Sequence, residues 1–148
     1  EFFAEHRLRH MARLAHEAGA LPAPVRSRID QLCGRLGKWL LEPDAPSLIH
    51  GDVWTGNVLP LPDGSGVGAL IDPAICYAHC ELEIAFTTLF STFSDAFYAR
   101  YAELRPLEPG FTEVRRDIYN LYPLLVHVRL FGAGYLAGIE RTLARLLG

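Results

Sequence analysis

The chain has 148 residues and a mass of 16.5 kDa; half of the residues are hydrophobic, 21% are charged and 11% are aromatic. This composition is typical of a globular domain with a buried core, and it excludes a disordered tail, a collagen-like fibre and a disulfide-stapled miniprotein. Charge or glycine interrupts every apolar stretch well before the roughly 18 residues of a membrane-spanning helix. The 14 basic and 17 acidic residues give a formal net charge of −3. Without a basic surplus we expect no nucleic-acid partner, and without a spanning stretch no membrane partner.

The cysteine count and the first residues both predict a cytoplasmic location. Three cysteines are an odd number in a chain of this size, which indicates reduced thiols in a reducing compartment. The N-terminal segment EFFAEHRLRH lacks the basic-then-apolar layout of an export signal. Among the basic residues Lys38 is the only lysine, so a mechanism that needs a lysine elsewhere must find it outside these residues.

Two helices are predicted in the first third of the chain. Residues 1–18 and about 25–41 each carry apolar side chains at steps of three and four, the spacing of an amphipathic helix. Residues 21–24 read as a connector between them, and the proline-containing segment 42–46 ends the second helix.

The middle third is predicted to contain short strands. The apolar run 47–49 leads into a His-Gly-Asp tripeptide and a tight loop. Residues 58–61 and 67–71 flank an Asp-Gly turn at 62–66, which is the pattern of a β-hairpin. Pro60 confines the first of these strands to a sheet edge.

The last third is predicted to be helical over about 81–93, 94–104 and 111–131, followed by a final helix. Pro123 is expected to kink or split the third of these segments. The final helix carries its apolar residues on one stripe: Leu136, Ile139, Leu143 and Leu146. The order of helices, one hairpin and helices predicts a mostly α single domain over residues 1–148, in the α+β class.

Three polar residues around the hairpin form the candidate chemical site. Asp52 and Asn57 lie on one irregular loop, and the hairpin brings Asp72 back to it. Two carboxylates and a carboxamide are the hard oxygen ligands that Mg²⁺ with a phosphate-bearing substrate requires. The Asp-x₄-Asn spacing matches the kinase catalytic loop, where the Asp receives the substrate hydroxyl and the Asn binds Mg²⁺. The alternative is that these residues cap loops and turns; the His-Gly before them and the Ile-Asp after the hairpin favour phosphoryl transfer.

A zinc site is the other metal interpretation that the sequence offers. Cys76, His79 and Cys80 lie within five residues. Structural zinc sites use separated pairs of ligands, and this cluster lacks that spacing, so we do not expect zinc there.

Longer motifs connect the chain to a known family. The strings LIHGDVWTGNVL and ALIDPAICYAHCELEIA resemble the fructosamine kinase (ketosamine-3-kinase) family, whose members show H-G-D-L-W-x-G-N-V, I-D-P-A and Y-G-H-x-E-x-D-L-A. The shorter His-Gly-Asp-x₄-Asn pattern is similar to the aminoglycoside-phosphotransferase and choline-kinase group. The segment LLVHVRLFGAGYL at 124–136 extends the resemblance towards the C-terminus. The resemblance implies a protein-kinase-like fold, of which this chain would be the C-terminal, catalytic-loop lobe.

The resemblance also implies chemical roles for matching residues. Asp52 would be the catalytic base toward a sugar hydroxyl. Asn57 and Asp72 would bind Mg²⁺ and ATP. Trp54, two residues after the base, would lie on the substrate side, where a flat ring can cover the sugar or its amine. The alternative for Trp54 is a packing residue under the loop.

Supporting roles follow from the same motifs. His50 would brace the loop by hydrogen bonding, and Glu83 would steady it from the following helix. Glu83 stands where the family has Asp, so its longer side chain departs from the family's pattern. Ala78 and Cys80 also depart, because the family has Gly and often Arg at these places.

The implied activity is ATP-dependent phosphorylation of a sugar hydroxyl on a ketosamine, such as a fructosamine or ribulosamine, free or protein-bound, in deglycation repair. A kinase of this type also needs an N-terminal lobe with a glycine-rich loop and a lysine on the phosphates. Neither precedes Asp52 here, and Lys38 lies on a predicted helix, so we expect this chain to lack that lobe and to be inactive alone. The alternatives are a kinase of the same fold for an aminoglycoside, choline or homoserine, and a non-enzymatic scaffold lobe.

Overall fold

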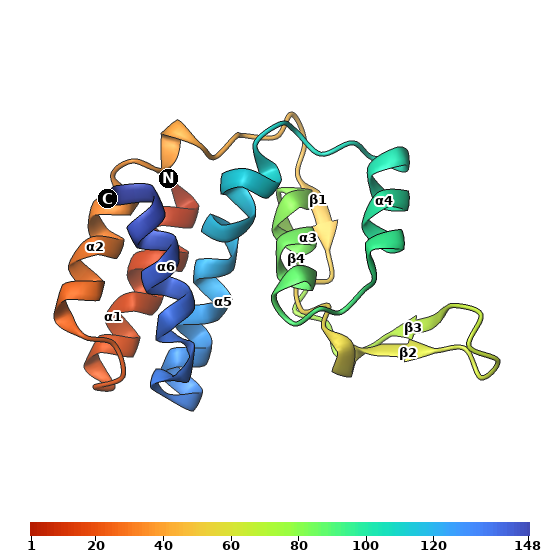
Figure 1. The fold of residues 1–148 in the computed structure, drawn as a ribbon, viewed down its shortest axis with the longest axis horizontal. Coiled ribbons are helices and arrows are strands. Elements are labelled where there is room, and N and C mark those ends of the chain that lie inside the picture. Colours follow the sequence, from red (N-terminus) through yellow and green to blue (C-terminus); the bar gives the residue numbers. More distant parts are fainter. The chain divides into compact units, whose positions relative to one another are not determined.

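The computed structural model describes residues 1–148, which form two compact units: residues 1–41 with 117–148, and residues 42–116. Helices make up most of the chain, and the strands form two short antiparallel pairs (Figure 1). The mostly helical α+β class predicted from the sequence is therefore confirmed. None of the helices is both long and apolar enough to cross a membrane.

The unit of residues 1–41 and 117–148 is entirely helical. Its elements are a π-helical segment (Phe3–Arg9) that runs into α1 (His10–Glu17), α2 (Ala23–Cys33), a 3₁₀ turn (Leu36–Lys38), α5 (Arg116–Phe131), a 3₁₀ turn (Ala133–Tyr135) and α6 (Leu136–Leu147). These helices enclose fully buried aliphatic side chains: Leu8, Ile29, Leu32, Leu121, Leu125, Ile139 and Leu143. The apolar stripes predicted from the sequence thus face a common core.

Two predicted helices differ in detail from the observed ones. The helix predicted at 25–41 instead begins at Ala23 and ends at Cys33, because Gly34 and Gly37 favour the helix least although the apolar spacing continues. The connector predicted at 21–24 already contains the start of the helix, whose first turn accommodates a proline without losing a hydrogen bond. Pro123 does not split α5, which continues to Phe131.

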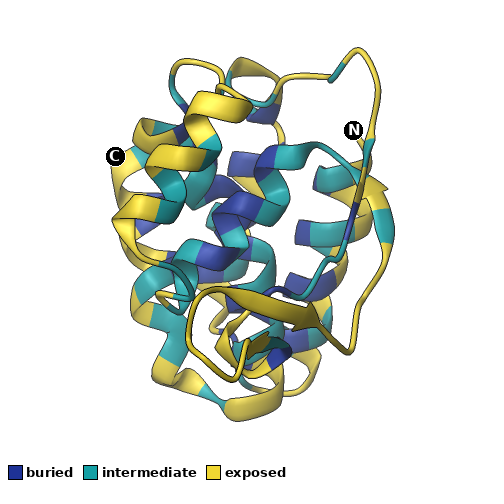
Figure 2. Cartoon of the chain, turned by 90° about the vertical axis from the view of Figure 1, so that its right-hand side faces the viewer, coloured by how far each residue is buried: buried dark blue, intermediate teal, exposed yellow.

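The unit of residues 42–116 combines short strands with helices. Its elements are β1 (Ser47–Ile49), a 3₁₀ turn (Thr55–Asn57), β2 (Val58–Pro60), β3 (Val67–Leu70), β4 (Cys76–Ala78), α3 (Cys80–Leu89), α4 (Asp95–Leu104) and a π-helical turn (Phe111–Arg115). The predicted hairpin is confirmed as β2 and β3, and it is exposed along almost its whole length (Figure 2). β4 was not predicted, because its partner β1 lies far away in the sequence.

The pairing of β1 with β4 brings the site residues together. The two strands are antiparallel, and Ile49 at the end of β1 is paired with Cys76 at the start of β4. The loop that follows β1 and the segment that precedes β4 therefore lie at the same end of the pair. Closure of the loop depends on this strand pair as well as on the predicted hairpin.

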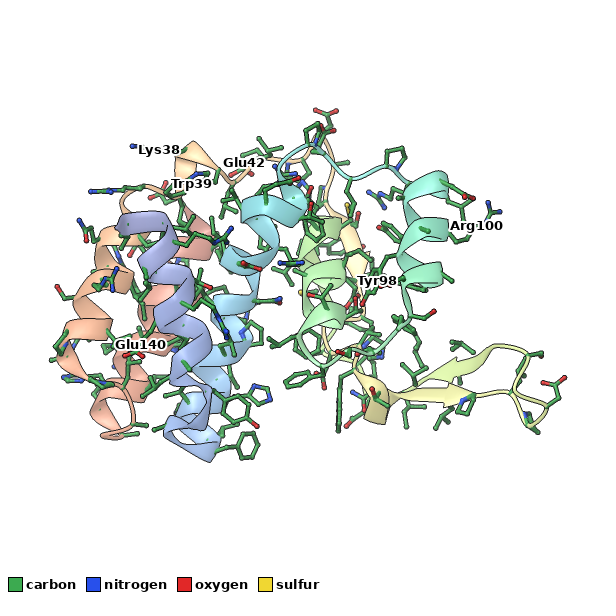
Figure 3. All side chains as sticks on the ribbon, in the orientation of Figure 1. Lys38, Trp39, Glu42, Tyr98, Arg100 and Glu140 are labelled. Atoms are coloured by element: carbon green, nitrogen blue, oxygen red, sulfur yellow. The ribbon has the colours of Figure 1, made fainter.

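Aromatic side chains attach α4 to α3. The Tyr98 hydroxyl donates to Thr87 Oγ1 at 3.2 Å, and Figure 3 shows Tyr98 pointing from α4 towards α3. Burial raises the pKa of Tyr101, and the neighbouring Cys80 raises it further. Arg100 points away from α3 (Figure 3) and pairs with Glu103 on the exposed side of α4.

Candidate active site

Glu83 holds the backbone of the loop that follows β1. Glu83 lies in the first turn of α3, and its Oε2 accepts a hydrogen bond from the His50 backbone N–H at 2.6 Å. Both carboxylate oxygens also accept from the Gly51 N–H, at 3.1 and 3.3 Å. A carboxylate that accepts consecutive N–H groups forms charge-assisted bonds, which are stronger than neutral ones. The loop is thereby tied to α3 immediately before Asp52.

Gly51 is required by the close approach of another segment. Its φ of +82° lies in the left-handed region, and a Cβ there would be 2.3 Å from the carbonyl oxygen of Ala74. Any side chain would therefore collide with backbone rather than with a flexible group. The segment around Asp72 and Ala74 consequently lies directly against the loop.

His50 connects the loop to the end of the hairpin. Its Nδ1 accepts from the Asp52 backbone N–H at 3.3 Å, and its Nε2 lies 3.0 Å from the carbonyl oxygen of Ile71. Because an N–H can only donate and a carbonyl can only accept, this arrangement requires the tautomer with the proton on Nε2. The ring thus joins the residue before Asp72 to Asp52 itself.

Asn57 orients the Asp52 carboxylate. Its Nδ2 donates to the Asp52 carbonyl oxygen at 2.9 Å and to Asp52 Oδ2 at 3.0 Å. Its backbone carbonyl accepts from the Ile71 N–H at 3.0 Å, which anchors the hairpin end to the same loop. Asn57 is buried, so these bonds are little exposed to competition from water.

Asp72 occupies an unusual backbone conformation. Its φ is +54°, in the left-handed region that is uncommon for residues other than glycine, and Asp is among those that tolerate it best. Its side chain is exposed, at the point where the hairpin ends beside the loop. Strained conformations of this kind cluster at functional sites, which makes Asp72 a candidate for binding rather than for packing.

Asn57 and Asp72 carry oxygen atoms of the kind that Mg²⁺ prefers. The Asn57 amide must place its nitrogen towards Asp52, where both partners are acceptors, and this leaves its oxygen as the atom for a cation. Mg²⁺ binds one or two protein oxygens and completes its shell with phosphates and water. The chain contains no group of three or more His, Cys, Asp or Glu side chains that could hold a metal. In the cysteine-rich segment, His79 Nδ1 accepts from the Glu81 N–H and caps α3.

Trp54 packs on the loop and remains partly open to solvent. A Cβ at Gly56 would lie 2.4–2.9 Å from three ring atoms of Trp54, so the ring rests on the glycine backbone. The side chain is nevertheless 42% exposed. The ring is therefore held in place by the loop while keeping surface available to a ligand.

One pair of charged residues near the site was not found from the sequence. Glu81 in the first turn of α3 and Arg115 at the end of the π-helical turn are both buried and form an ion pair at 2.6 Å. Glu81 belongs to a family motif, whereas no sequence signal marks Arg115. Arg115 lies 34 residues after Glu81, and a separation of this length does not predict an ion pair.

Comparison with known proteins places the chain in a family. The sequence profile described as "Fructosamine kinase" matches residues 1–148. The chain belongs to the fructosamine kinase family. A protein from Synechocystis described as a probable ketoamine kinase is 40% identical over 150 residues, covering 99% of this chain and 48% of that protein. A chloroplastic protein-ribulosamine 3-kinase from Oryza sativa subsp. indica is 46% identical over 90 residues, 61% of this chain and 25% of that protein.

Solved structures agree with this family assignment. A crystal structure from Thermobifida fusca, described as a fructosamine-3-kinase, superposes with a TM-score of 0.87 at 36% identity over 97% of this chain. A second, from Haemophilus somnus, superposes with a TM-score of 0.80 at 31% identity. The chain spans about half the length of these relatives, 49% and 48% respectively.

Proposed function

We propose that the full-length protein transfers the γ-phosphoryl group of ATP to a sugar hydroxyl of a ketosamine, a sugar joined to an amine by glycation. The observation that carries this proposal is the hydrogen bond from Asn57 Nδ2 to Asp52 Oδ2, within the His-Gly-Asp-x₄-Asn loop of a fructosamine kinase family member. The matching relatives are described as ketoamine and ribulosamine kinases, which supports a fructosamine or ribulosamine substrate, free or protein-bound. Deglycation repair in the cytoplasm is the corresponding cellular role.

In the proposed reaction Asp52 accepts the proton of the sugar hydroxyl, the hydroxyl oxygen forms a bond to the γ-phosphorus, and ADP leaves. Asn57 holds one oxygen of the Asp52 carboxylate, which orients the base. Glu83 holds the preceding backbone, so that little reorganisation is needed when the substrate arrives. A positioned base of this kind contributes roughly 10²–10⁴-fold to the rate.

Asn57 and Asp72 are the proposed ligands of Mg²⁺ bound with ATP. The ion neutralises the charge of the phosphates when bound. The left-handed backbone at Asp72 and the orientation of the Asn57 amide support this assignment. Trp54 is proposed to cover the sugar or its amine, which its fixed and partly exposed ring supports.

We further propose that residues 1–148 correspond to the C-terminal, catalytic-loop lobe of a kinase-like fold and are inactive by themselves. The chain spans about half of its relatives, and its single lysine, Lys38, lies in the 3₁₀ turn after α2, before the catalytic loop (Figure 3). A glycine-rich loop and a lysine that bind the phosphates would come from the rest of the full-length protein.

The decisive experiment measures ADP release by the full-length protein with Mg²⁺ and ATP. The panel contains fructosyl- and ribulosyl-amines, aminoglycosides, choline and homoserine, and residues 1–148 alone serve as a parallel sample. Turnover on ketosamines only, with no turnover by the isolated chain, is the expected result. Turnover on another panel member would contradict the proposed ketosamine substrate but would still support the proposed role of the catalytic loop. Absence of both turnover and ATP binding would favour a scaffold.

A further inference from the structure

A buried ion pair with further hydrogen bonds to the backbone lies beside the candidate site. Glu81 and Arg115 are 1% and 5% exposed. Arg115 Nε donates to Glu81 Oε2 at 2.7 Å, and Arg115 Nη2 donates to Glu81 Oε1 at 2.6 Å. Arg115 Nη2 also donates to the backbone carbonyl of Glu108 at 2.7 Å, and Nη1 donates to that of Pro109 at 2.8 Å. Arg115 therefore joins the loop before it to the first turn of α3.

A buried ion pair adds little to folding stability compared with apolar packing. Removing two charges from water is costly, and well-packed apolar residues of similar volume are often as stabilising. What a bidentate pair provides is direction, because the planar guanidinium fixes the carboxylate in one orientation. The geometry of the first turn of α3 is thus defined more sharply than apolar packing would define it.

That turn is also the one that holds the catalytic loop. Glu81 and Glu83 are two residues apart at the start of α3. Arg115 holds Glu81, whereas Glu83 accepts the N–H groups of His50 and Gly51, directly before Asp52. Hydrogen bonds and two residues of α3 therefore connect Arg115 to the backbone of His50 and Gly51, directly before the proposed base.

We propose that Glu81 and Arg115 are a positioning pair, which sets the place of the Asp52 loop through Glu83. The proposal rests on the proposed function, because it assigns these residues to the geometry of that reaction. Neither residue touches the reacting atoms. Their loss is expected to displace the base without removing any group that binds substrate.

The test uses the full-length protein with Arg115→Lys, which keeps the charge but cannot form the bidentate fork. The matched control is Arg100→Lys, which alters an exposed Arg–Glu pair on α4 in the same unit. We expect kcat to fall roughly 10- to 100-fold in Arg115→Lys with both KM values unchanged, since small displacements of a reacting group cost this much. Arg100→Lys should retain normal kcat.

A second readout does not depend on activity. Amide hydrogen exchange of residues 50–52 should accelerate at least roughly tenfold in Arg115→Lys, while exchange in the buried part of α5 stays unchanged. Unchanged exchange at 50–52 would overturn the positioning role. If the wild-type protein showed no ketosamine turnover but Arg115→Lys still accelerated this exchange, the proposed function would fail and the positioning role would stand.

Two further variants separate positioning from stability. Glu81→Gln keeps the shape and one acceptor oxygen, and it replaces Arg115→Lys if that variant fails to fold. The double variant Glu81→Leu with Arg115→Met replaces the pair by apolar side chains, which is expected to recover the melting temperature. For a positioning pair, kcat stays low in the double variant although stability returns. Recovery of kcat together with the melting temperature would show that the pair acts only on stability.

Discussion

Different interactions stabilise the interior of each of the two units. Residues 1–41 and 117–148 contain most of the buried apolar side chains, nearly all of them on helices. Residues 42–116 contain only five: Ile49, Val53, Ile84, Ala85 and Phe111. Four of the six buried polar residues lie in this second unit: Asn57, Glu81, Thr87 and Arg115.

This difference in buried residues indicates that polar interactions, more than apolar packing, define the geometry of the candidate site. Apolar packing is non-directional and tolerates small shifts, whereas hydrogen bonds and ion pairs depend on both distance and angle. The proposed catalytic loop is held by Glu83, His50 and Asn57 through directional bonds. We therefore expect substitutions in the first unit to change stability, and substitutions in the second to change turnover.

The largest effect is expected for Asp52→Asn in the full-length protein. The substitution removes the proposed base but keeps the backbone carbonyl that accepts from Asn57, so the loop should stay folded. Ketosamine turnover should fall by roughly 10²–10⁴-fold, with ATP binding retained. Steady-state kinetics and nucleotide titration measure the two quantities. Asp63→Asn, in the exposed hairpin turn, is the control, and near-normal turnover in Asp52→Asn would refute the assignment.

The next largest effect is a loss of folding stability, expected for a substitution in the unit of residues 1–41 and 117–148. Leu125 in α5 is fully buried. Leu125→Ala should lower the free energy of unfolding by about 2–5 kcal/mol, because it removes apolar surface and leaves a cavity. Chemical denaturation measures this loss, and kcat of the folded protein should not change. A large loss of kcat at a temperature where the variant is folded would contradict the expectation that substitutions in this unit change only stability.

Loss of the Glu83 carboxylate should lower both folding stability and turnover. Glu83→Ala leaves the N–H groups of His50 and Gly51 without their partner, which costs about 1–3 kcal/mol of stability. Turnover should fall as well, because the loop before Asp52 is no longer tied to α3. Glu83→Gln keeps an acceptor oxygen and should recover part of both. If Glu83→Ala lowered the melting temperature without any change in kcat, this carboxylate would be structural only.

The smallest effect concerns thiol chemistry. Burial raises the pKa of Cys33 to about 11, against an ordinary value of 9.0. Because the folded state disfavours the thiolate, its contribution to stability is complete below pH 9 and is lost as the pH rises towards 11. Alkylation at pH 8 followed by mass spectrometry should therefore modify the less buried Cys76 and Cys80 before Cys33. Equal rates at the three cysteines would contradict this.

Local patterns explain which parts of the fold could be predicted. The helices of the first unit follow from apolar spacing, and the β2–β3 hairpin follows from its Asp-Gly turn. The end of α2 was placed too late, because apolar spacing continues past Gly34 although the helix does not. β4 was missed, because three residues form a strand only when β1 is beside them.

The sequence by itself determined the family, the helical class and the identity of the candidate site residues, since these depend on spacing within short segments. The resemblance implied that His50 and Glu83 support the loop, but only the tertiary structure decided which atoms each residue binds. It placed Ala74 against Gly51 and the Ile71 carbonyl beside the His50 ring. It also directed the Glu81 carboxylate to Arg115 and the Glu83 carboxylate to the loop before Asp52. Such contacts join residues 20 or more positions apart. Sequence spacing carries no information about a directional bond between segments that meet only in the folded chain.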